Sequence, residues 1–512
     1  MLLLVPHKIS IFVVLGAAFV IILVGNAIRS QKLSSMVKIF GYLLLLLPPL
    51  LYFLNLGVID ILSSLFSMLT AIVGAAVTAF TNIYEVRKYR ERNLRILIDV
   101  FILTVYAVFV SPNLLSFIMF WLFAEIVGFF AIVFEIHRRT LVAGLRYLLV
   151  SMVPADIALL TLIAATAMNV GFQEALALPI DRISQYLGQL NAVLSLILFL
   201  GFMAKAAVAP FHFWLPDAHS LAPAPASAIL SGVMVKMGVY GIIRTLPAIS
   251  SEPVLYAVLI LSSMTVVYGG LQALVQNDIK RLLAYSTIED TSLMVLALAL
   301  YKLTGISTLF TATIMFVFAH GVFKAALFMN SGIVEVSTHT RELTKLGYLS
   351  KFLPIPSISA LIAVLSLLGV PPTLGFLAKL YLLAGVIEAI YIDTGIGVLT
   401  LIIASIGVGL AVMYGVKYLT IYWGSLESRH HSVETLTEGL LIKSELGLSL
   451  MSVVLSVPLF MLFTIGGLSA IEPLYLASLV MVEAAFLTLL YYIYTRAKSI
   501  AQEVLWIGGV TP

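Results

Sequence analysis

Long apolar runs, separated by short polar segments, follow one another along the whole chain. A helix that crosses the hydrocarbon layer of a membrane needs roughly 20 mostly apolar residues, and this pattern predicts about 14–15 such helices. They cover 9–28, 39–56, 60–84, 95–111, 114–135, 141–169, 190–210, 226–248, 253–275, 282–301, 304–333, 355–391, 397–423, 444–467 and 473–495. The first run is longer than the apolar core of a signal peptide, so we expect it to be a retained first helix.

The composition supports this all-α, polytopic membrane fold. Of 512 residues, 61% are hydrophobic and 11% are charged, whereas a soluble domain usually carries about 25% charged residues. The chain has no Cys, so it offers no thiolate for an iron–sulfur cluster or a metal. It also has no Walker-type loop, no clustered metal ligands and no nucleophile elbow. We therefore expect no cofactor, no metal and no redox centre in this chain.

The positive charges in the connections predict an orientation, because cytoplasmic loops concentrate Lys and Arg. The connections after odd-numbered helices hold Arg29, Lys32, Lys38, Arg87, Lys88, Arg90, Arg92, Arg95, Arg138, Arg139, Lys280, Arg281, Arg341, Lys345, Lys351, Arg429, Lys443, Arg496 and Lys498. The opposite side, including the N-terminus, holds only Lys8, Arg182 and Lys302. This asymmetry predicts an outside N-terminus and a cytoplasmic C-terminus in a cell membrane. It also accounts for the net charge of +4 without a nucleic-acid partner.

Prolines interrupt the predicted helices at three places. Residues 210–225 contain four prolines, so the seventh and eighth helices must be joined by a loop or a re-entrant turn. Pro371-Pro372 predicts a broken twelfth helix, because the freed backbone carbonyls need protein or water partners at that depth. Pro48-Pro49 in the second helix predicts only a kink.

An internal repeat accompanies the two larger breaks. Gly201-Phe202-Met203-Ala204-Lys205 precedes the first break, and Gly375-Phe376-Leu377-Ala378-Lys379 follows the second. The two helices lie five apart in the series and therefore run in opposite directions, as in transporters built from inverted repeats. We expect N-terminal helices in 1–93, inverted five-helix repeats in 94–248 and 249–424, and C-terminal helices in 425–512.

Charged side chains within the predicted helices mark the candidate site. A charged side chain at the bilayer centre costs at least about 2.5–3.5 kcal/mol, so it needs a partner or water, and such residues are usually functional. At a rise of 1.5 Å per residue, Glu125 and Lys205 should lie at similar depth, with Lys236 close to the midplane. We assign the site to Glu125, Lys205, Lys236, His320 and Lys379, with Lys324, Glu289 and Asp290 as further members.

These residue types suit proton transfer, because each can gain or lose a proton when the charge of its neighbour changes. A carboxylate beside a lysine favours the ammonium form, so Glu125 and Lys205 are expected to act as a switch. The proton would pass from Lys205 to Lys236 and through His320 to Lys379. The structural alternative is a set of static ion pairs that hold helices together.

Other polar residues have simpler interpretations. Lys417, Arg244 and Arg146 lie near helix ends, where long basic side chains commonly extend to the membrane surface. Asp156 can pair with Arg146 or modulate the site. Glu335 and His339 are expected at a solvated helix end, and His212 and His219 are expected to form hydrogen bonds within their own loop.

Seven motifs occur along the chain in one order. They are Phe123-Ala124-Glu125, Gly201-Phe202-Met203-Ala204-Lys205, Trp214-Leu215-Pro216-Asp217-Ala218-His219, Ser231-Gly232-Val233-Met234-Val235-Lys236, Asp278-Ile279-Lys280-Arg281-Leu282-Leu283-Ala284-Tyr285-Ser286, His320-Gly321-Val322-Phe323-Lys324-Ala325, and Gly369-Val370-Pro371-Pro372 through Lys379. Together they resemble the antiporter-like subunit family that is shared by respiratory complex I, Mrp-type sodium/proton antiporters and membrane-bound, energy-converting hydrogenases. The resemblance covers roughly residues 60–425.

The resemblance implies a subunit that translocates protons or sodium. It implies that Glu125 and Lys205 form the coupled pair, that Lys236 and His320 are central relay groups and that Lys379 is the exit-side lysine. It also implies membrane partners in a respiratory or antiporter complex, including further antiporter-like subunits. Residues 231–236 and 288–290 look most like the hydrogenase-linked branch, whereas several complex I members have a histidine near position 290. The path through the tenth helix therefore stays open.

Three functions remain open from the sequence. The first is an ion-pumping subunit driven by a redox arm on other chains, as in a membrane-bound hydrogenase or a relative of complex I. The second is a subunit of a non-redox, Mrp-type sodium/proton antiporter. The third is a structural membrane scaffold. The sequence does not identify the ion, its direction or the driving reaction, and we expect protons, sodium and lipid as the small partners.

Overall fold

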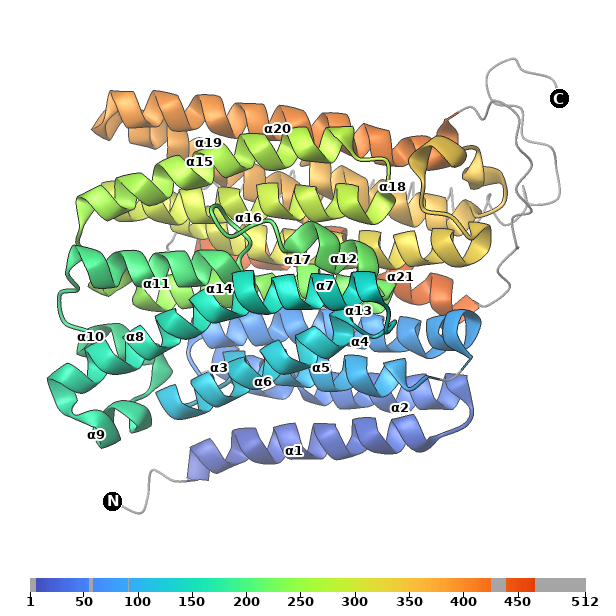
Figure 1. Cartoon of the computed structure of the whole chain (residues 1–512), viewed down its shortest axis with the longest axis horizontal. Coiled ribbons are helices and arrows are strands. Elements are labelled where there is room, and N and C mark those ends of the chain that lie inside the picture. The colour runs from blue at the N-terminus through green and yellow to red at the C-terminus, as the bar shows by residue number, and fades with distance from the viewer. Residues whose placement is uncertain (1–5, 55–58, 91, 425–438, 466–512) are drawn as a thin grey trace.

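Helices lying side by side make up almost the whole structure (Figure 1). It is a computed structural model that describes residues 6–54, 59–90, 92–424 and 439–465. The predicted helix 473–495, the C-terminus, the first five residues and the loop charges Arg429, Arg496 and Lys498 lie outside these residues. Within the described part there is no strand. Eleven helices, counting adjoining helical segments together, are long and apolar enough to cross a membrane. The chain is therefore an all-α, multi-pass membrane protein.

The N-terminal half of the chain contains the first fourteen α-helices and two π-helical turns. They are α1 (Pro6–Ala27), α2 (Gln31–Leu44), α3 (Leu47–Phe53), α4 (Ile61–Tyr89), α5 (Leu94–Phe109), α6 (Leu114–Ile132), α7 (Arg138–Tyr147), η1 (Leu148–Met152), α8 (Val153–Val170), α9 (Phe172–Ala177), η2 (Ile180–Arg182), α10 (Ile183–Tyr186), α11 (Ala192–Lys205), α12 (Leu215–Leu221), α13 (Ala224–Ile229), η3 (Leu230–Met234), α14 (Val235–Thr245) and η4 (Leu246–Ala248). Of these, η1 and η3 are π-helical, and η2 and η4 are 3₁₀ turns.

The second half of the described structure contains fewer and, on average, longer helices. They are α15 (Glu252–Val275), α16 (Ile279–Thr304), α17 (Ser307–Thr338), the 3₁₀ turns η5 (Leu343–Lys345) and η6 (Leu349–Lys351), α18 (Pro354–Leu368), α19 (Leu374–Ile392), α20 (Thr394–Trp423), α21 (Gly439–Val454) and α22 (Ser456–Ile465). Each predicted helix from 9–28 to 444–467 has a counterpart in the structure.

The second predicted helix starts earlier than its hydropathy suggests. The apolar run predicts a start at residue 39, but α2 already begins at Gln31. Lys38, which the charge pattern placed in a loop, is therefore inside a helix and fully buried. Ser34, Ser35 and Lys38 in the first two turns of α2 are buried against protein, so a search for apolar runs does not include them in the helix. The helix α2 ends at Leu44 and α3 begins at Leu47, so the span is interrupted just before Pro48 and Pro49, where we expected a kink.

Side chains define where several helices begin. The Asp60 carboxylate accepts a hydrogen bond from the Ser63 backbone N–H at the start of α4, and Asn113 and Ser116 form a reciprocal capping box at the start of α6. Asp278 caps α16 in the same way as Asp60 caps α4. Because these caps satisfy N–H groups that have no partner within the helix, they fix the first turn of each helix at the ends of the bundle.

The helices differ in how much of their surface other helices cover. In the most apolar 18-residue stretch of each helix, 100% of the residues of α17 and 94% of those of α16 are buried. The corresponding share is 33% in α20 and in the α7–α8 segment. The helices α16 and α17 therefore form the centre of the bundle, and α20 and α8 present apolar side chains outward, as expected towards lipid. Charged residues on α16 and α17 lie in protein surroundings.

Two interruptions of the helical pattern occur where the prolines predict them. The helix α11 ends at Lys205, and the chain turns through Ala207, at φ 57°, before the short helix α12. The helix α18 ends at Leu368, and Gly369, at φ 79°, leads to α19. Each break lies next to one lysine of the repeated pentapeptide. The structure thus brings backbone carbonyl groups, as well as charged side chains, into the interior of the bundle.

Candidate functional site

The first group of the candidate site joins α6 to α11. The Lys205 ammonium lies 2.6 Å from Glu125 Oε1, and both side chains are fully buried. Trp121 Nε1 donates a hydrogen bond of 3.0 Å to the same carboxylate oxygen. Lys205 Nζ also donates to the Tyr147 hydroxyl at 3.2 Å. The pair is therefore enclosed by aromatic side chains, and its two charges offset each other in a site without solvent contact.

The helix break supports Lys205 directly. Because α11 stops at Lys205, the last carbonyl groups of the helix have no partner in a following turn. Trp214 Nε1, which lies beyond the break, donates a 3.0 Å hydrogen bond to the Ala204 carbonyl oxygen. The indole of Trp214 also packs edge-on against Tyr147. The loop thus holds both the end of α11 and the residue that contacts Lys205.

Asp156 belongs to this first group. It interacts electrostatically with Glu125 and Lys205. The alternative pairing with Arg146 is wrong, because Arg146 NH1 forms an ion pair with Asp217 instead. Asp217 also binds Arg281 NH1 at 2.7 Å. Arg146 therefore connects α7 to the short helix α12 and does not simply extend to the membrane surface.

The second group surrounds Lys236 at the start of α14. Lys236 Nζ is within hydrogen-bonding reach of His320 Nδ1 on α17, and it donates to the Ser231 carbonyl oxygen at 2.5 Å. That carbonyl belongs to the π-helical turn η3. Such π turns often occur at functional positions, but their local geometry could not be read from the hydropathy pattern.

Two glycines allow η3 and α17 to approach so closely. A Cβ atom on Gly232 would lie 3.1 Å from Ala325 Cβ and 3.2 Å from the Gly321 carbonyl oxygen, and a Cβ on Gly321 would lie 3.0 Å from the Gly232 carbonyl oxygen. Side chains at either position would force the backbones apart. The two glycines therefore set the distance at which Lys236 meets His320.

Asp290 links His320 to Lys324 across α16 and α17. Its Oδ2 atom lies 3.7 Å from His320 Nε2 and 3.3 Å from Lys324 Nζ. Lys324 also donates to the Ser286 hydroxyl. Glu289, the preceding residue, points towards α15 and α20, because its carboxylate would lie 3.2 Å from a Cβ on Gly270 and 3.4 Å from one on Gly407. The two adjacent acids therefore serve different sides of α16.

Lys379 stands apart from these contacts. Its amine donates hydrogen bonds of 2.8 Å and 3.3 Å to the carbonyl oxygens of Leu367 and Leu368, where α18 ends. It interacts with Asp290 and Glu289 through charge, but it forms no ion pair with them within 4.0 Å. Among the described residues, no hydrogen bond or ion pair joins Lys205 to Lys236 either. The eight predicted site residues, which we call the charged row, thus form two contact groups with Glu289 and Lys379 beside the second.

The row has no features of a metal site. In the portion of the chain that the structure describes, no three His, Asp or Glu residues lie close enough to hold a metal ion. The carboxylates of Glu125 and Asp290 instead face lysine and histidine side chains, and this mixture of acid, amine and imidazole suits the exchange of protons between neighbours.

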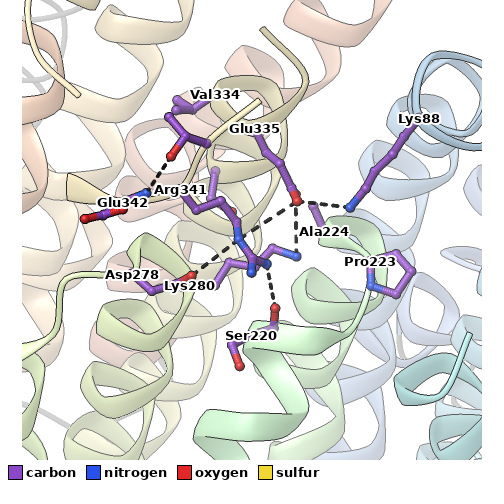
Figure 2. Close-up of polar contacts among 12 residues, drawn as sticks. Lys88, Ser220, Pro223, Ala224, Asp278, Lys280, Val334, Glu335, Arg341 and Glu342 are labelled. Atoms are coloured by element: carbon purple, nitrogen blue, oxygen red, sulfur yellow. Dashed lines mark hydrogen bonds and ion pairs between the residues drawn. The ribbon is translucent and has the colours of Figure 1, made fainter. Parts of the chain in front are cut away.

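A second ion cluster lies at the end of the bundle where connections rich in Lys and Arg meet. We call this end, with Lys88, Lys280 and Arg341, the basic face. Figure 2 shows Glu335 of α17 turned towards Lys88 of α4 and Lys280 of α16, at 3.1 Å and 3.9 Å. Arg341 approaches Glu335 at 3.9 Å and Asp278 at 3.4 Å. Glu335 was expected at a solvated helix end, but its side chain is only 18% exposed. Lys280 was expected in a loop, but it is fully buried.

This cluster also holds the loop of the first break. Lys280 Nζ donates 2.7 Å to the Ala222 carbonyl oxygen, and Arg341 NH1 donates 2.5 Å to that of Ser220. His219 lies close by in the chain, stacked on Phe328 with ring centroids 4.6 Å apart. The expectation of hydrogen bonds within the loop is wrong for His219 Nδ1 and Nε2 and for His212 Nδ1, which have no partner in the described structure.

Several charged contacts were missed or misread from the sequence. Lys38 forms a buried ion pair of 2.6 Å with Asp99. Arg244 does not extend to the membrane surface but binds Asp60 through two hydrogen bonds of 2.8 Å and 2.6 Å. Lys417 binds the carbonyl oxygens that end α15. Asp99 and Glu445 both lie within predicted apolar helices, so a search for every acid in those helices would have found them.

The fold and the enclosed charges together define a polytopic membrane protein whose ionisable residues lie inside the helical bundle. Residues 111–407 match the profile of the NADH:quinone oxidoreductase/Mrp antiporter transmembrane family, and this chain belongs to that family. All seven motifs lie within the matched residues, so the family that they indicate is confirmed.

The relatives come from three kinds of complex. Hydrogenase-4 component B of Escherichia coli is 28% identical over 391 residues, which are 72% of this chain and 57% of that protein. NADH-quinone oxidoreductase subunit M of Rickettsia conorii is 28% identical, with 72% and 73% of the two chains covered. The A/B component of a probable K⁺/H⁺ antiporter of Rhizobium meliloti is 31% identical, with 69% and 35% covered.

A solved structure has the same fold. The chain aligns with the Mrp complex from a Dietzia species at a TM-score of 0.74 and 21% sequence identity, which covers 98% of this chain and 58% of that one. The match thus spans little more than half of hydrogenase-4 component B and of this Mrp chain. Each of the named relatives is a component or a subunit of a larger assembly.

Proposed function

We propose that this chain is a proton-translocating membrane subunit of a multi-subunit complex. The charged row carries the proposal. Seven of its members are 0–1% exposed and Lys379 is 6% exposed, yet acids, amines and an imidazole lie side by side in it. Such groups are costly to enclose in a membrane and are usually retained for ion movement.

In this proposal Glu125 and Lys205 load the proton. While the 2.6 Å contact holds, the carboxylate favours the ammonium form of Lys205, and separation of the pair favours release. Lys236 then passes a proton to His320 Nδ1, with which it is in contact. Asp290 lies on the other side of the imidazole and steadies the charge that results, and Lys324 accepts next.

Two gaps in the row need motion or water. One lies between Lys205 and Lys236, and the other between Lys324 and Lys379. Each gap has a helix break at one side, where backbone carbonyl groups can accept hydrogen bonds from water. Lys379 must leave the carbonyl oxygens of Leu367 and Leu368 before it can give up a proton. The breaks thus supply the movable parts, and we propose that 94–248 and 249–424 are inverted copies that place one break in each half.

We further propose that redox chemistry on other chains drives the movement, as the component of a hydrogenase among the relatives suggests. The basic face would be cytoplasmic, the N-terminus outside and the C-terminus cytoplasmic, in accordance with the charge of the loops. The partners would be membrane subunits, further antiporter-like chains among them. Exchange of sodium for protons without a redox arm is the competing function, since antiporter subunits are also among the relatives.

The test begins with the native assembly. Iron–sulfur or nickel proteins in the purified complex would support the redox-driven pump, and small hydrophobic subunits alone would support the exchanger. Proton flux is then measured with a pH dye trapped in proteoliposomes. We expect Lys205→Ala and Lys236→Ala to abolish flux while the complex still assembles, and Lys345→Ala, at the surface, to leave it unchanged. Wild-type flux in both buried variants would mean that the row is a scaffold.

A further inference from the structure

A second buried acid lies outside the charged row, on α21. Glu445 is fully buried, and its Oε1 atom accepts a 3.0 Å hydrogen bond from Asn330 Nδ2. By distance and angle, its Oε2 atom has no hydrogen-bond partner in the part of the chain that is described, although the Ser359 side chain on α18 also interacts with the carboxyl group. No Lys, Arg or His among the described residues lies within ion-pairing distance or interacts with it through charge. In this respect Glu445 differs from Glu125 and Asp290, each of which has a lysine beside it.

Asn330 fixes the direction of the contact. Its Oδ1 atom accepts hydrogen bonds from the hydroxyls of Tyr418 and Tyr422 at 2.7 Å and 2.9 Å. Its Nδ2 group donates to the Pro356 carbonyl oxygen at 3.0 Å and to Glu445. An amide side chain has two acceptor sites and two donor hydrogens, so every position is used. The amide cannot turn over without losing these partners, and Glu445 Oε1 must remain an acceptor.

A line of tyrosines connects this contact to the row. Tyr414, Tyr418 and Tyr422 follow one another at intervals of four along α20 and therefore share one face of that helix. All three are at most 1% exposed. Tyr414 lies beside Glu289 and interacts with it electrostatically. The distances and angles give no hydrogen bond among the described residues for the Tyr414 hydroxyl or for either oxygen of Glu289.

The line runs from the interior towards the basic face. Glu289 lies ten residues after the start of α16, roughly 15 Å into the bundle at 1.5 Å per residue. Glu445 lies six residues after the start of α21, roughly 9 Å in. The contacts of α17 relate the two depths: Glu445 contacts Asn330, which lies five residues before Glu335, and Glu335 pairs with Lys280 at the start of α16. Glu445 is therefore closer to the basic face than the row is.

We propose that Glu445 is a proton-binding site whose state is sensed by Glu289 through Asn330 and the tyrosines of α20. Removing a bare carboxylate from water costs several kcal/mol, and here no cation among the described residues offsets that cost. A carboxyl group in such surroundings takes up a proton rather than remain charged. The proton is carried by Oε2, the atom without a partner, because Oε1 already accepts from Asn330.

The amide and the hydroxyls then report whether the proton is present. An ionised Glu445 polarises the Asn330 amide and strengthens the hydrogen bonds from Tyr418 and Tyr422, and a neutral Glu445 weakens them, since linked hydrogen bonds reinforce one another. Tyr418 and Tyr414 lie on one rigid helix, so the change reaches the tyrosine beside Glu289. This inference rests on the proposed function, because Glu289 matters only if the row moves protons.

Infrared spectroscopy tests the site without any transport assay. The full chain in its native complex is compared with Glu445→Gln, which keeps an oxygen to accept from Asn330. We expect loss of one protonated-carboxyl band that shifts in D₂O. The matched control is Glu388→Gln. Glu388 is an exposed acid near the C-terminal end of α19 that accepts a hydrogen bond from the Thr308 hydroxyl, and its replacement should leave the infrared band in place. A spectrum unchanged by Glu445→Gln would overturn the proposal.

Transport tests the connection. Tyr418→Phe removes one hydroxyl from Asn330, and because a change within such a network modulates the coupling between sites, we expect proton flux to fall about twofold or more. Tyr391→Phe, at a tyrosine that is 88% exposed, is the control. Wild-type flux in Tyr418→Phe refutes the connection. If Lys236→Ala abolishes flux while the infrared band is absent from the wild type, the inference fails and the proposed function stands. If the band is present in the wild type but Lys236→Ala keeps wild-type flux, Glu445 remains a proton-binding site and the proposed function fails.

Discussion

The buried contact between Lys38 and Asp99 allows a quantitative test of how the N-terminal helices are held. The Asp99 carboxylate accepts from Tyr42 at 3.0 Å and Thr78 at 2.6 Å on Oδ1. Its Oδ2 atom accepts from Asn26 at 2.8 Å and contacts the Lys38 ammonium at 2.6 Å. All these partners are donors, and they come from α1, α2 and α4.

Asp99→Asn keeps the size of the side chain but removes its charge and replaces one acceptor with an NH₂ group. The NH₂ group can lie only beside the Tyr42 and Thr78 hydroxyls, which must turn to accept from it, because the other position faces the Asn26 amide and the Lys38 ammonium. Lys38 then loses its ion pair and keeps only neutral acceptors, among them Asn82 Oδ1 at 2.9 Å. Breaking one partner out of a buried ion pair typically costs about 3–5 kcal/mol, and we expect a loss of unfolding free energy in this range.

The assay is denaturant unfolding of the purified full chain in lipid nanodiscs, followed by circular dichroism. Asp181→Asn is the control, because Asp181 and Arg182 form an exposed pair at 3.9 Å, and surface pairs contribute about 0–1 kcal/mol. The double variant Lys38→Met/Asp99→Asn should recover part of the loss, since it no longer buries an unpaired ammonium group. A single Asp99→Asn variant within about 1 kcal/mol of the wild type would refute the reasoning.

Two further predictions concern Arg244 and the glycine contact. Burial alone raises the pKa of Asp60, but the hydrogen bonds and charge of Arg244 outweigh it, so the pKa of Asp60 lies below its usual 3.8. This pair thus contributes stability that is present above about pH 4 and is lost as the pH falls through the lowered pKa. In Asp60→Asn, the free energy of unfolding measured against pH should therefore fall less steeply below about pH 4 than in the wild type. Gly232→Ala would place a Cβ atom 3.1 Å from Ala325 Cβ and separate Lys236 from His320. We expect the complex to assemble but its proton flux to fall about tenfold or more. The control is Gly409→Ala, where the space is open, and its flux should equal that of the wild type. Full flux in Gly232→Ala would show that the close helix contact is unnecessary.

The positions of the helices and the chief members of the charged row follow from single-residue properties. Apolar length identifies each span in the described part, and the cost of a charge in hydrocarbon singles out residues such as Glu125 and Lys236. The contact between Glu125 and Lys205 also follows from their similar depths on strongly apolar helices. These predictions depend on one dimension, the depth along the membrane normal.

What the sequence could not supply is the direction of each side chain around its helix. Glu289 and Asp290 are neighbours in sequence and equal in depth, yet only Asp290 reaches Lys324. The positions of Lys280 and Glu335 near helix ends predict solvent exposure, but tertiary contacts enclose both side chains. The π turns at η1 and η3 shift the register of α8 and α14, and a pattern of period 3.6 does not reveal such a shift.

The repeated pentapeptide shows why equal motifs need not have equal roles. Lys205 ends α11, so its amine is free to reach Glu125 while Trp214 satisfies the carbonyl group that the break exposes. Lys379 lies one turn and more inside α19, and its amine itself satisfies the exposed carbonyl oxygens of Leu367 and Leu368. Lys379 interacts with Asp290 and Glu289 only through charge at a distance, whereas Lys205 has an acid in direct contact that holds its proton. Under the proposed function, the first lysine would retain a proton until its acid moves away, and the second would release one when water replaces it at the end of α18. We propose that this difference gives the charged row a direction that the sequence repeat alone does not have.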